Sequence, residues 1–389
     1  MAPDPQAATA AYIDALGVDA LAKSAAYTIG SHWLLLWSLL VAIAVAWLIV
    51  RSRLLDRVEA RLGKRGPNTR VFAVGVVYFV VAGVLTLPWS MYEGWWRERS
   101  YGRSSQGFGD AFAQDLLGIG ISALLAGLFF LGVYALMRRT GRRWWVWSGG
   151  LAVVAISVVL LVAPVAIQPL FNEFKPLAEG PVRTALVGMA RDAGISPDRI
   201  FVYDGSRQSN NFTANVSGIG PSARIAISDI ALKGASLDEV RAVTAHEIGH
   251  YRMHHVWRQV ALLSLLVMAA FLVADRVYGR VAAAFGSRAP LSSPTSLPVV
   301  MLMVSFLSLL CMPIINGLTR IGEMQADRYS LETAGLPDAM ATALVKTAEY
   351  RYPRPTPLQE FLFYSHPSVE RRVRMAMDWK AVNGAAPPK

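Results

Sequence analysis

Long runs of uncharged, mostly apolar residues alternate with short polar connections along most of the chain. A membrane-spanning helix needs about 20 consecutive apolar residues, because the hydrocarbon core of a bilayer is about 30 Å thick. Six runs are candidates, at 32–50, 71–92, 116–137, 144–171, 260–274 and 297–315. The fifth is short enough to be a buried core helix unless its flanking residues extend it. The pattern predicts a mainly α-helical polytopic membrane protein with six spans.

The composition agrees with a membrane protein, since 54% of the 389 residues are hydrophobic and only 17% are charged. Residues 1–30 lack a basic segment followed by an apolar stretch, so we expect no cleavable signal peptide. The single cysteine, Cys311, lies in the last apolar run. The chain therefore has no intramolecular disulfide and no thiolate cluster, and any metal ion must be held by histidine and carboxylate side chains.

Much of the net charge of +11 lies in two short connections between the apolar runs. Their basic residues are Arg51, Arg53, Arg57, Arg61, Lys64, Arg65 and Arg70 in the first connection, and Arg138, Arg139, Arg142 and Arg143 in the second. Lysine and arginine next to membrane spans usually indicate the orientation of the protein in the membrane. A nucleic-acid partner is therefore the weaker interpretation. The positive-inside rule puts both connections in the cytoplasm, and counting onward then puts residues 172–255 and the C-terminus outside.

After the fourth run the residues become those of a water-facing globular region. Residues 181–194 have helical spacing between a proline and a glycine, and 199–204, 213–218 and 223–229 are short β-prone segments. These signals predict a small α+β domain at the membrane boundary. We expect a four-span membrane domain at 1–171, the inserted domain at 172–255, two further spans at 256–318 and a polar, mostly helical part at 319–389.

A helix with a marked start carries the clearest chemical motif. Ser236 and Glu239 form a capping box, so a helix should begin near residue 237 and run through His246-Glu247-x-x-His250 towards the fifth span. A four-residue step turns an α-helix by about 400°, which stacks the two imidazoles on one face where both can bind one ion. Glu247 follows His246 and lies one position further round the helix. It can take a proton from the attacking water, so it is the expected general base.

A catalytic zinc ion needs a third protein ligand, for which we select Glu323. It lies just after the last apolar run, in a pattern with Asn316, Arg320 and Asp327 whose spacings of four, three and four place all four side chains on one helical face. The alternative on spacing alone is a salt-bridge ladder among Arg320, Glu323 and Asp327. Asp327 could also orient a ligand imidazole from behind, as metal-binding histidines usually require.

Three further features each have two interpretations. His366, in Tyr-Ser-His-Pro, could donate a hydrogen bond to the oxyanion or could be a helix-start residue. The segment Thr213-Ala214-Asn215 could offer a strand edge to an extended peptide or be a structural strand. His254 and His255 follow the motif, but they do not fit the extended three-histidine pattern, which needs histidine at position 256. We expect these two histidines to be bystanders.

These motifs together resemble the integral-membrane zinc peptidases that include the type I CAAX prenyl protease. The resemblance rests on the two-histidine motif, on Pro-Trp-Ser-x-Tyr at 88–92, on Pro-Leu-Phe-Asn at 169–172, on Asp-Gly-Ser at 204–206, on the 316–327 pattern and on Ser-His-Pro at 365–367. It implies that Glu323 is the third ligand of a gluzincin-type site, that Glu247 is the base, and that Arg320, Asp327 and His366 support them.

The family's prenyl proteases have seven spans, and the resemblance implies a cytoplasmic metal domain, opposite to the side that the charge count gives. The side of the active site is therefore left open. The sequence departs from the family at Thr213-Ala214-Asn215, which leaves the substrate preference open.

The expected reaction is hydrolysis of a peptide bond with one Zn²⁺ per chain. Expected substrates are peptides or membrane-associated proteins, with a prenylated peptide as one candidate. The alternatives are a transporter with a structural zinc site and a catalytically silent membrane scaffold that binds peptides. Transporters usually carry ionisable groups inside their spans, whereas most runs here have none. The presence of Glu247 between the two histidines argues against a silent scaffold.

Overall fold

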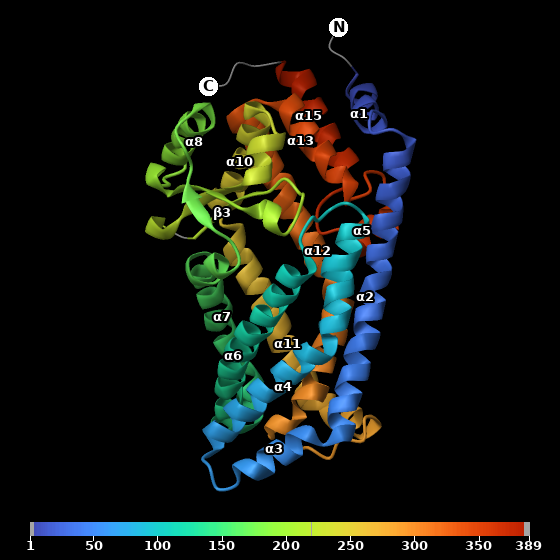
Figure 1. The fold of residues 1–389 in the computed structure, drawn as a ribbon, viewed down its shortest axis with the longest axis vertical. Helices are drawn as coiled ribbons and strands as arrows, with labels where there is room; N and C mark the ends of the chain where they lie inside the picture. The colour runs from blue at the N-terminus through green and yellow to red at the C-terminus, as the bar shows by residue number, and fades with distance from the viewer. Residues whose placement is uncertain (1–3, 219, 385–389) are drawn as a thin grey trace.

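The fold is given by a computed structural model that describes residues 4–218 and 220–384. Long helices fill the lower part of Figure 1, and a small sheet with shorter helices forms the upper part. Five continuous helical segments are apolar and long enough to cross a bilayer: Val18–Ser52, Pro67–Ser100, Phe108–Leu170, His255–Ala284 and Pro294–Ala334. These segments contain five of the six predicted runs in full and the sixth, 144–171, except for its last residue.

The third segment contains two of the runs because it folds back on itself. It consists of α6 (Phe108–Thr140) and α7 (Trp144–Val162), joined by a 3-10 turn at Gly141–Arg143. The two helices pack side by side (Figure 1). Gly141 has a φ of 52°, a left-handed conformation that glycine adopts without strain.

The other long helices are α2 (Val18–Ser52), α4 (Pro67–Met91), α11 (His255–Ala284) and α12 (Leu297–Ala334). The short fifth run is therefore extended at both ends, as a membrane span requires, and α11 has 30 residues. Shorter helices are α1 (Pro5–Asp14), α3 (Leu54–Leu62) and α5 (Glu98–Ser100), and the π-helix η1 (Tyr92–Arg97) follows α4.

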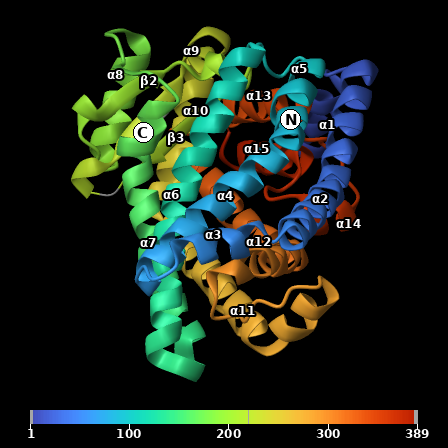
Figure 2. The same cartoon turned by 60° about the horizontal axis from the view of Figure 1, so that its bottom comes forward.

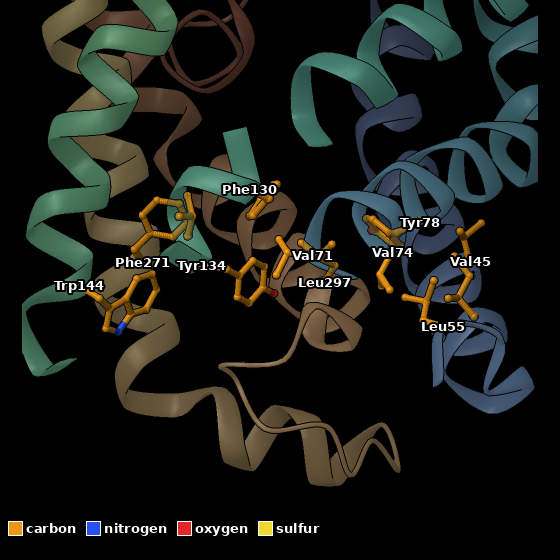
Figure 3. Packing of buried hydrophobic residues seen from close by; sticks show 12 residues of the cluster. Val45, Leu55, Val71, Val74, Tyr78, Phe130, Tyr134, Trp144, Phe271 and Leu297 are labelled. Carbon is orange, nitrogen blue, oxygen red and sulfur yellow. The ribbon is translucent and has the colours of Figure 1, made fainter. Parts of the chain in front are cut away.

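Buried apolar side chains from all six of these long helices and from α3 form one core in the membrane region, part of which is drawn in Figure 3. Close helix approach supports this core. Gly75 of α4 faces Gly127 of α6, and a Cβ on Gly75 would lie 3.6 Å from the Gly127 Cα. Small residues at such crossings let helix backbones approach closely, which membrane helices need because lipid gives little hydrophobic drive between them.

The sheet has four strands in the order β1-β2-β4-β3. They are β1 (Phe174–Pro176), β2 (Ile200–Tyr203), β3 (Ala214–Ser217) and β4 (Arg224–Ser228). The three strands predicted from sequence are confirmed, and β1 was missed. β3 is an edge strand, antiparallel to β4, and β2 and β4 are parallel.

Helices α8 (Pro181–Asp192) and α10 (Leu237–Arg252) share a buried apolar core with the sheet, and α9 (Asp229–Gly234) follows β4. The C-terminal region adds α13 (Pro337–Lys346), α14 (Pro357–Phe363) and α15 (Val369–Asn383). Gly335, the predicted stop, ends α12 in a left-handed conformation with a φ of 64°. α1 packs on α15 (Figure 1).

α10 begins as predicted but does not continue into α11. The Ser236 hydroxyl accepts a hydrogen bond from the Glu239 N–H, and the Glu239 carboxylate accepts one from the Ser236 N–H. The helix ends at Arg252, and His254 adopts a left-handed φ of 54° before α11 starts at His255. The helix therefore runs through both histidines towards the fifth span, as expected, and a break separates it from α11.

The two basic connections lie at the end of the molecule farthest from α10. α3 carries most of the first connection and the turn between α6 and α7 carries the second, and both come forward when the molecule is turned in Figure 2. The histidine motif and the basic connections therefore lie at opposite ends of the helix bundle. The order of the predicted spans along the chain requires this arrangement.

Ser236→Ala should destabilise the protein by about 1 kcal/mol, because it leaves the backbone N–H of Glu239 at the start of α10 without its partner. Thr333→Ala is the matched control. Thr333 is exposed in the last turn of α12 and bonds only the carbonyl of Tyr329 one turn back, so its loss should have little effect. Thermal unfolding of both variants in the same detergent measures the difference, and equal shifts would contradict a capping role for Ser236.

Candidate metal centre

Three side chains from two helices form a compact set of ligand atoms. His246 and His250 come from α10 and Glu323 comes from α12, and their ligand atoms all lie within 4.8 Å of one another. His246 Nε2 is 3.1 Å from His250 Nε2 and 3.3 Å from Glu323 Oε2, and His250 Nε2 is 3.4 Å from Glu323 Oε1. The structure thus brings together the three ligands that the sequence predicted.

The set is suited to a cation. Glu323 is only 5% exposed, and its Oε2 atom has only the two longer contacts with His246 Nε2 at 3.3 Å and Arg372 Nη2 at 3.6 Å among the described residues. Burial of a carboxylate carries a large desolvation cost, which a bound cation would help to offset. Two imidazoles and one carboxylate are the donor set of many catalytic zinc sites.

Close packing of α10 on α12 sets the ligand distances. Gly249 lies between Glu247 and His250 on the side that faces α12, and a Cβ there would lie 3.2 Å from the Ala326 Cα and 3.2 Å from the Tyr329 Cβ. Glycine therefore permits an approach that a larger residue would prevent. This approach lets the Glu323 carboxylate reach both imidazoles.

Asp327 lies behind His246, as expected for a residue that orients a ligand. Its Oδ1 atom is 2.8 Å from His246 Nδ1. The carboxylate also accepts hydrogen bonds from Arg372 of α15, at 2.7 Å from Nε and 2.6 Å from Nη2. Arg372 Nη2 is 3.6 Å from Glu323 Oε2 as well. Asp327 and Arg372 are both buried and form a fork-like pair that holds the carboxylate in place.

Electrostatics around His246 follow from this arrangement. Burial alone would lower the pKa of His246, but Asp327 and Glu323 outweigh it and raise this pKa to about 10. Two carboxylates therefore favour positive charge at this position, either as a proton on the imidazole or as a bound cation that replaces it. Burial raises the pKa of Glu247, although the nearby histidines oppose it. Glu247 lines the same cavity as His246 and Glu323, a space of about 230 Å³ that Phe212 and Ala214 also line.

His366 reaches the same cavity from the loop between α14 and α15. Its Nε2 atom is 3.3 Å from Glu323 Oε1, and its Nδ1 atom is 3.0 Å from the Ser365 hydroxyl. Burial, aided by the charge of Arg351, lowers the pKa of His366 to about 3. The imidazole is therefore neutral at physiological pH and has one N–H to donate.

Arg320 and Asn316 share a helical face with Glu323, but the structure does not bring them to the metal-binding atoms. Arg320 donates to the carbonyls of Glu360 and Tyr364, and Asn316 donates to the carbonyl of Leu362 at 3.0 Å. They hold α14 and the segment that leads to His366. The direct roles predicted for Arg320 in catalysis and for Asn316 around the ligands need this correction.

His255 lies outside the set of three candidate ligands, as expected, but it is in contact with one of them, His250. Its Nδ1 atom is 2.8 Å from His250 Nδ1, and its Nε2 atom is 3.1 Å from Gln325 Oε1. His254 has an exposed side chain with no hydrogen bond among the described residues.

The predicted peptide-binding segment follows the edge of the sheet. The Thr213 hydroxyl is bonded to the Tyr203 hydroxyl at 2.6 Å, so it is occupied within the sheet. Ala214 lines the cavity of the metal centre. The side-chain oxygen of Asn215 is buried and has no hydrogen-bond partner among the described residues.

Two family models together match most of the chain. The model of Peptidase family M48 matches residues 176–380, and the model described as CAAX prenyl protease N-terminal, five membrane helices, matches residues 6–173. In that second region, α2, α4, α6 and α7 are the described helices of 19 residues or more.

Individual proteins agree with the family models. The uncharacterised metalloprotease YhfN of Bacillus subtilis is 28% identical over 349 residues, which cover 88% of this chain and 80% of that protein. CAAX prenyl protease 1 of Saccharomyces cerevisiae is 30% identical over 241 residues, covering 57% and 53%. The crystal structure of S. mikatae Ste24p has the same fold, with a TM-score of 0.77 at 22% identity, covering 92% of this chain and 89% of that one.

A cluster that could hold a metal ion lies where membrane helices meet a small α+β fold, as a membrane-embedded metalloprotease requires, and these matches place the protein in that class. The chain belongs to peptidase family M48. It is an integral, multi-pass membrane protein.

Arg372→Ala should destabilise the protein by about 3–5 kcal/mol, because the Asp327 carboxylate would remain buried without its partner. Arg374→Ala, on the same helix, is the matched control. Arg374 pairs with Asp378 one turn away at an exposed site, so its removal should cost at most about 0.5 kcal/mol. Thermal unfolding measured by intrinsic fluorescence compares the variants, and similar losses in both would count against the buried pair.

Proposed function

We propose that the protein is a zinc metalloendopeptidase that cleaves peptides or membrane-associated proteins at the membrane boundary. The observation that carries this proposal is the three-ligand cluster of His246, His250 and Glu323, with Glu247 in the same cavity and a free strand edge beside it. Zinc accepts two imidazoles and one carboxylate while leaving a position open for water or substrate. A bound zinc ion would polarise the scissile carbonyl and make water nucleophilic at neutral pH.

Glu247 is the proposed general base. It follows the first histidine of the motif on α10 and lines the cavity, where burial raises its pKa towards the value that a proton carrier needs. It takes a proton from the attacking water and delivers it to the leaving amine. His366 is the proposed oxyanion donor, because its neutral imidazole can present one N–H to the same cavity.

The edge of β3 is the proposed site for the substrate backbone. The carbonyl of Thr213 accepts a hydrogen bond from the N–H of Ser228 in β4. Alternate residues of an antiparallel strand bond to the same neighbour, so the backbone groups of Ala214 and Val216 point to the free edge. An extended peptide could add there as a further strand.

Two cavities flank this edge and indicate the substrate class. Ala214 lines the cavity of the metal centre, and Val216 lines a second cavity of about 260 Å³ that also borders His250. The walls of the second cavity come largely from α7 and α11, with Leu160 and Trp257 among them. A peptide along β3 would place an apolar group there, which favours membrane-associated substrates, and a prenylated peptide is one of these.

Neither alternative explains the site. A silent scaffold would have no use for Glu247 in the cavity of the metal ligands, and a transporter would be expected to place its cation site within the bilayer rather than beside a peptide-binding strand edge.

Purified wild-type protein should hold one zinc ion per chain and hydrolyse peptides. Glu247→Gln should retain zinc but lose activity by a factor of about 10²–10⁴, the usual contribution of an acid–base group. Glu323→Ala should lose both zinc and activity. Glu332→Ala, an exposed glutamate on the same helix, is the matched control and should behave as wild type. Elemental analysis and a peptide-cleavage assay give both readouts, and full activity in Glu247→Gln would exclude it as the base.

Substrate peptides methylated at single backbone nitrogens should test the strand-edge proposal. Methylation removes one N–H at a time, so binding should fall at alternate positions that face β3 and persist at the positions between them. Competition against a fluorescent peptide, using the Glu247→Gln protein to prevent cleavage, measures this pattern. Loss of binding without a period of two would show that the peptide does not add to β3.

A further inference from the structure

The metal-binding imidazole of His250 is the first member of a hydrogen-bonded chain that leads to α11 and α12. His250 Nδ1 is 2.8 Å from His255 Nδ1, and His255 Nε2 is 3.1 Å from Gln325 Oε1. Arg258 Nη1 donates to the same oxygen at 3.2 Å. The chain lies behind His250, on the side of the ring away from the nitrogen that faces Glu323.

The chemistry of these residues fixes which atom donates and which accepts in each hydrogen bond. A guanidinium group can only donate hydrogen bonds, so the Gln325 atom facing Arg258 must be the amide oxygen. His255 Nε2 must then donate to that oxygen. A neutral imidazole with its proton on Nε2 has an acceptor at Nδ1. His250 Nδ1 must therefore donate, which leaves the lone pair of His250 Nε2 directed at the metal position.

The break between α10 and α11 makes this contact possible. In a continuous α-helix, a residue five positions after His250 would lie about 140° round the axis and point elsewhere. The left-handed conformation of His254, with a φ of 54°, turns the chain so that the His255 ring returns to His250. A non-glycine residue in this conformation carries backbone strain, which the surrounding contacts must offset.

Gly322 of α12 leaves space for the side chains of His255 and Arg258. A Cβ on Gly322 would lie 2.5 Å from Arg258 Nη2 and 3.4 Å from His255 Nδ1. Any side chain at this position would thus displace the Arg258 guanidinium, which donates to Gln325. Gly322 and Gln325 precede and follow Glu323 on the same helix, so the chain and the third ligand share one segment of α12.

We propose that His255 is a positioning residue that holds His250 in the tautomer able to bind metal, and that it links the metal centre to the first turn of membrane helix α11. This inference rests on the proposed metal site. Asp327 lies behind His246 in a similar way, with Oδ1 2.8 Å from His246 Nδ1, so each imidazole has a polar group next to its Nδ1 atom, one charged and one neutral. Such partners fix ring orientation and strengthen metal binding.

The test compares three substitutions of His255 that distinguish the effect of the hydrogen-bond acceptor from the effect of the ring volume. In His255→Asn, the side-chain oxygen can take the place of Nδ1 and accept from His250. In His255→Gln, the amide reaches the place of Nε2 and can contact Gln325 but not His250. His255→Leu fills the space without polar atoms. His254→Asn is the control, because asparagine tolerates the left-handed conformation and His254 contacts no ligand.

Full-length protein in detergent is stripped of metal and titrated with zinc against a chelating dye. His255→Gln and His255→Leu should bind zinc about 10–100-fold more weakly than wild type, the usual effect of losing such a partner. His255→Asn and the His254→Asn control should stay near the wild-type value. The visible absorption spectrum of the cobalt-substituted proteins should change in the same two weakened variants.

Equal zinc affinity in all three His255 variants would overturn the proposal. Tight zinc binding in His255→Gln with weak binding in His255→Asn would also overturn it, because this result would indicate that side-chain volume or the Gln325 contact matters instead. If His255→Leu does not fold, the comparison of Asn with Gln still decides the matter, because both carry the same amide group. Wild-type protein that binds no zinc would refute the proposed function itself, which is a separate result.

Discussion

The close contact between α10 and α12 is the constraint on which the site depends. The histidines come from α10 and the carboxylates from α12, so the ligand set exists only where these helices nearly touch. Gly249 permits this approach, since a Cβ there would meet the Ala326 backbone at 3.2 Å. The buried pair of Asp327 and Arg372 then fixes the rotation of α12, because one carboxylate faces both the guanidinium and the His246 ring. A small shift of either helix would change every distance in the cluster.

Local patterns predicted most of the fold because they report on local geometry. The length of the apolar runs indicated the membrane helices. Short β-prone segments bounded by turn residues indicated three of the four strands. β1 could not be found this way, because its three residues form a strand only through pairing with β2. The break after Arg252 was also hidden. Helix ends are usually marked by glycine or proline, whereas here His254 takes the left-handed conformation.

The site was predictable as far as spacing along one helix determines it. The 316–327 pattern placed four polar side chains on one helical face and selected Glu323 among them, but it did not show which partner each residue meets. Arg320 and Asn316 lie on that face and bind carbonyls between Glu360 and Tyr364. Arg372 and His255 were missed for the opposite reason. Their positions relative to the ligands are set by the docking of α15 and by the turn before α11, and no local spacing encodes either.

The membrane region and the peptidase region are physically continuous at the metal centre. α12 runs without a break from Leu297 to Ala334, so it crosses the boundary that composition suggested at residue 318 and carries Glu323 beyond the apolar run. α11 begins at His255, in contact with a metal ligand. Because both membrane helices contribute contacts within or directly behind the ligand set, packing in the bilayer helps to set the ligand geometry. The metal centre therefore depends on the assembled helix bundle and not on the α+β unit alone.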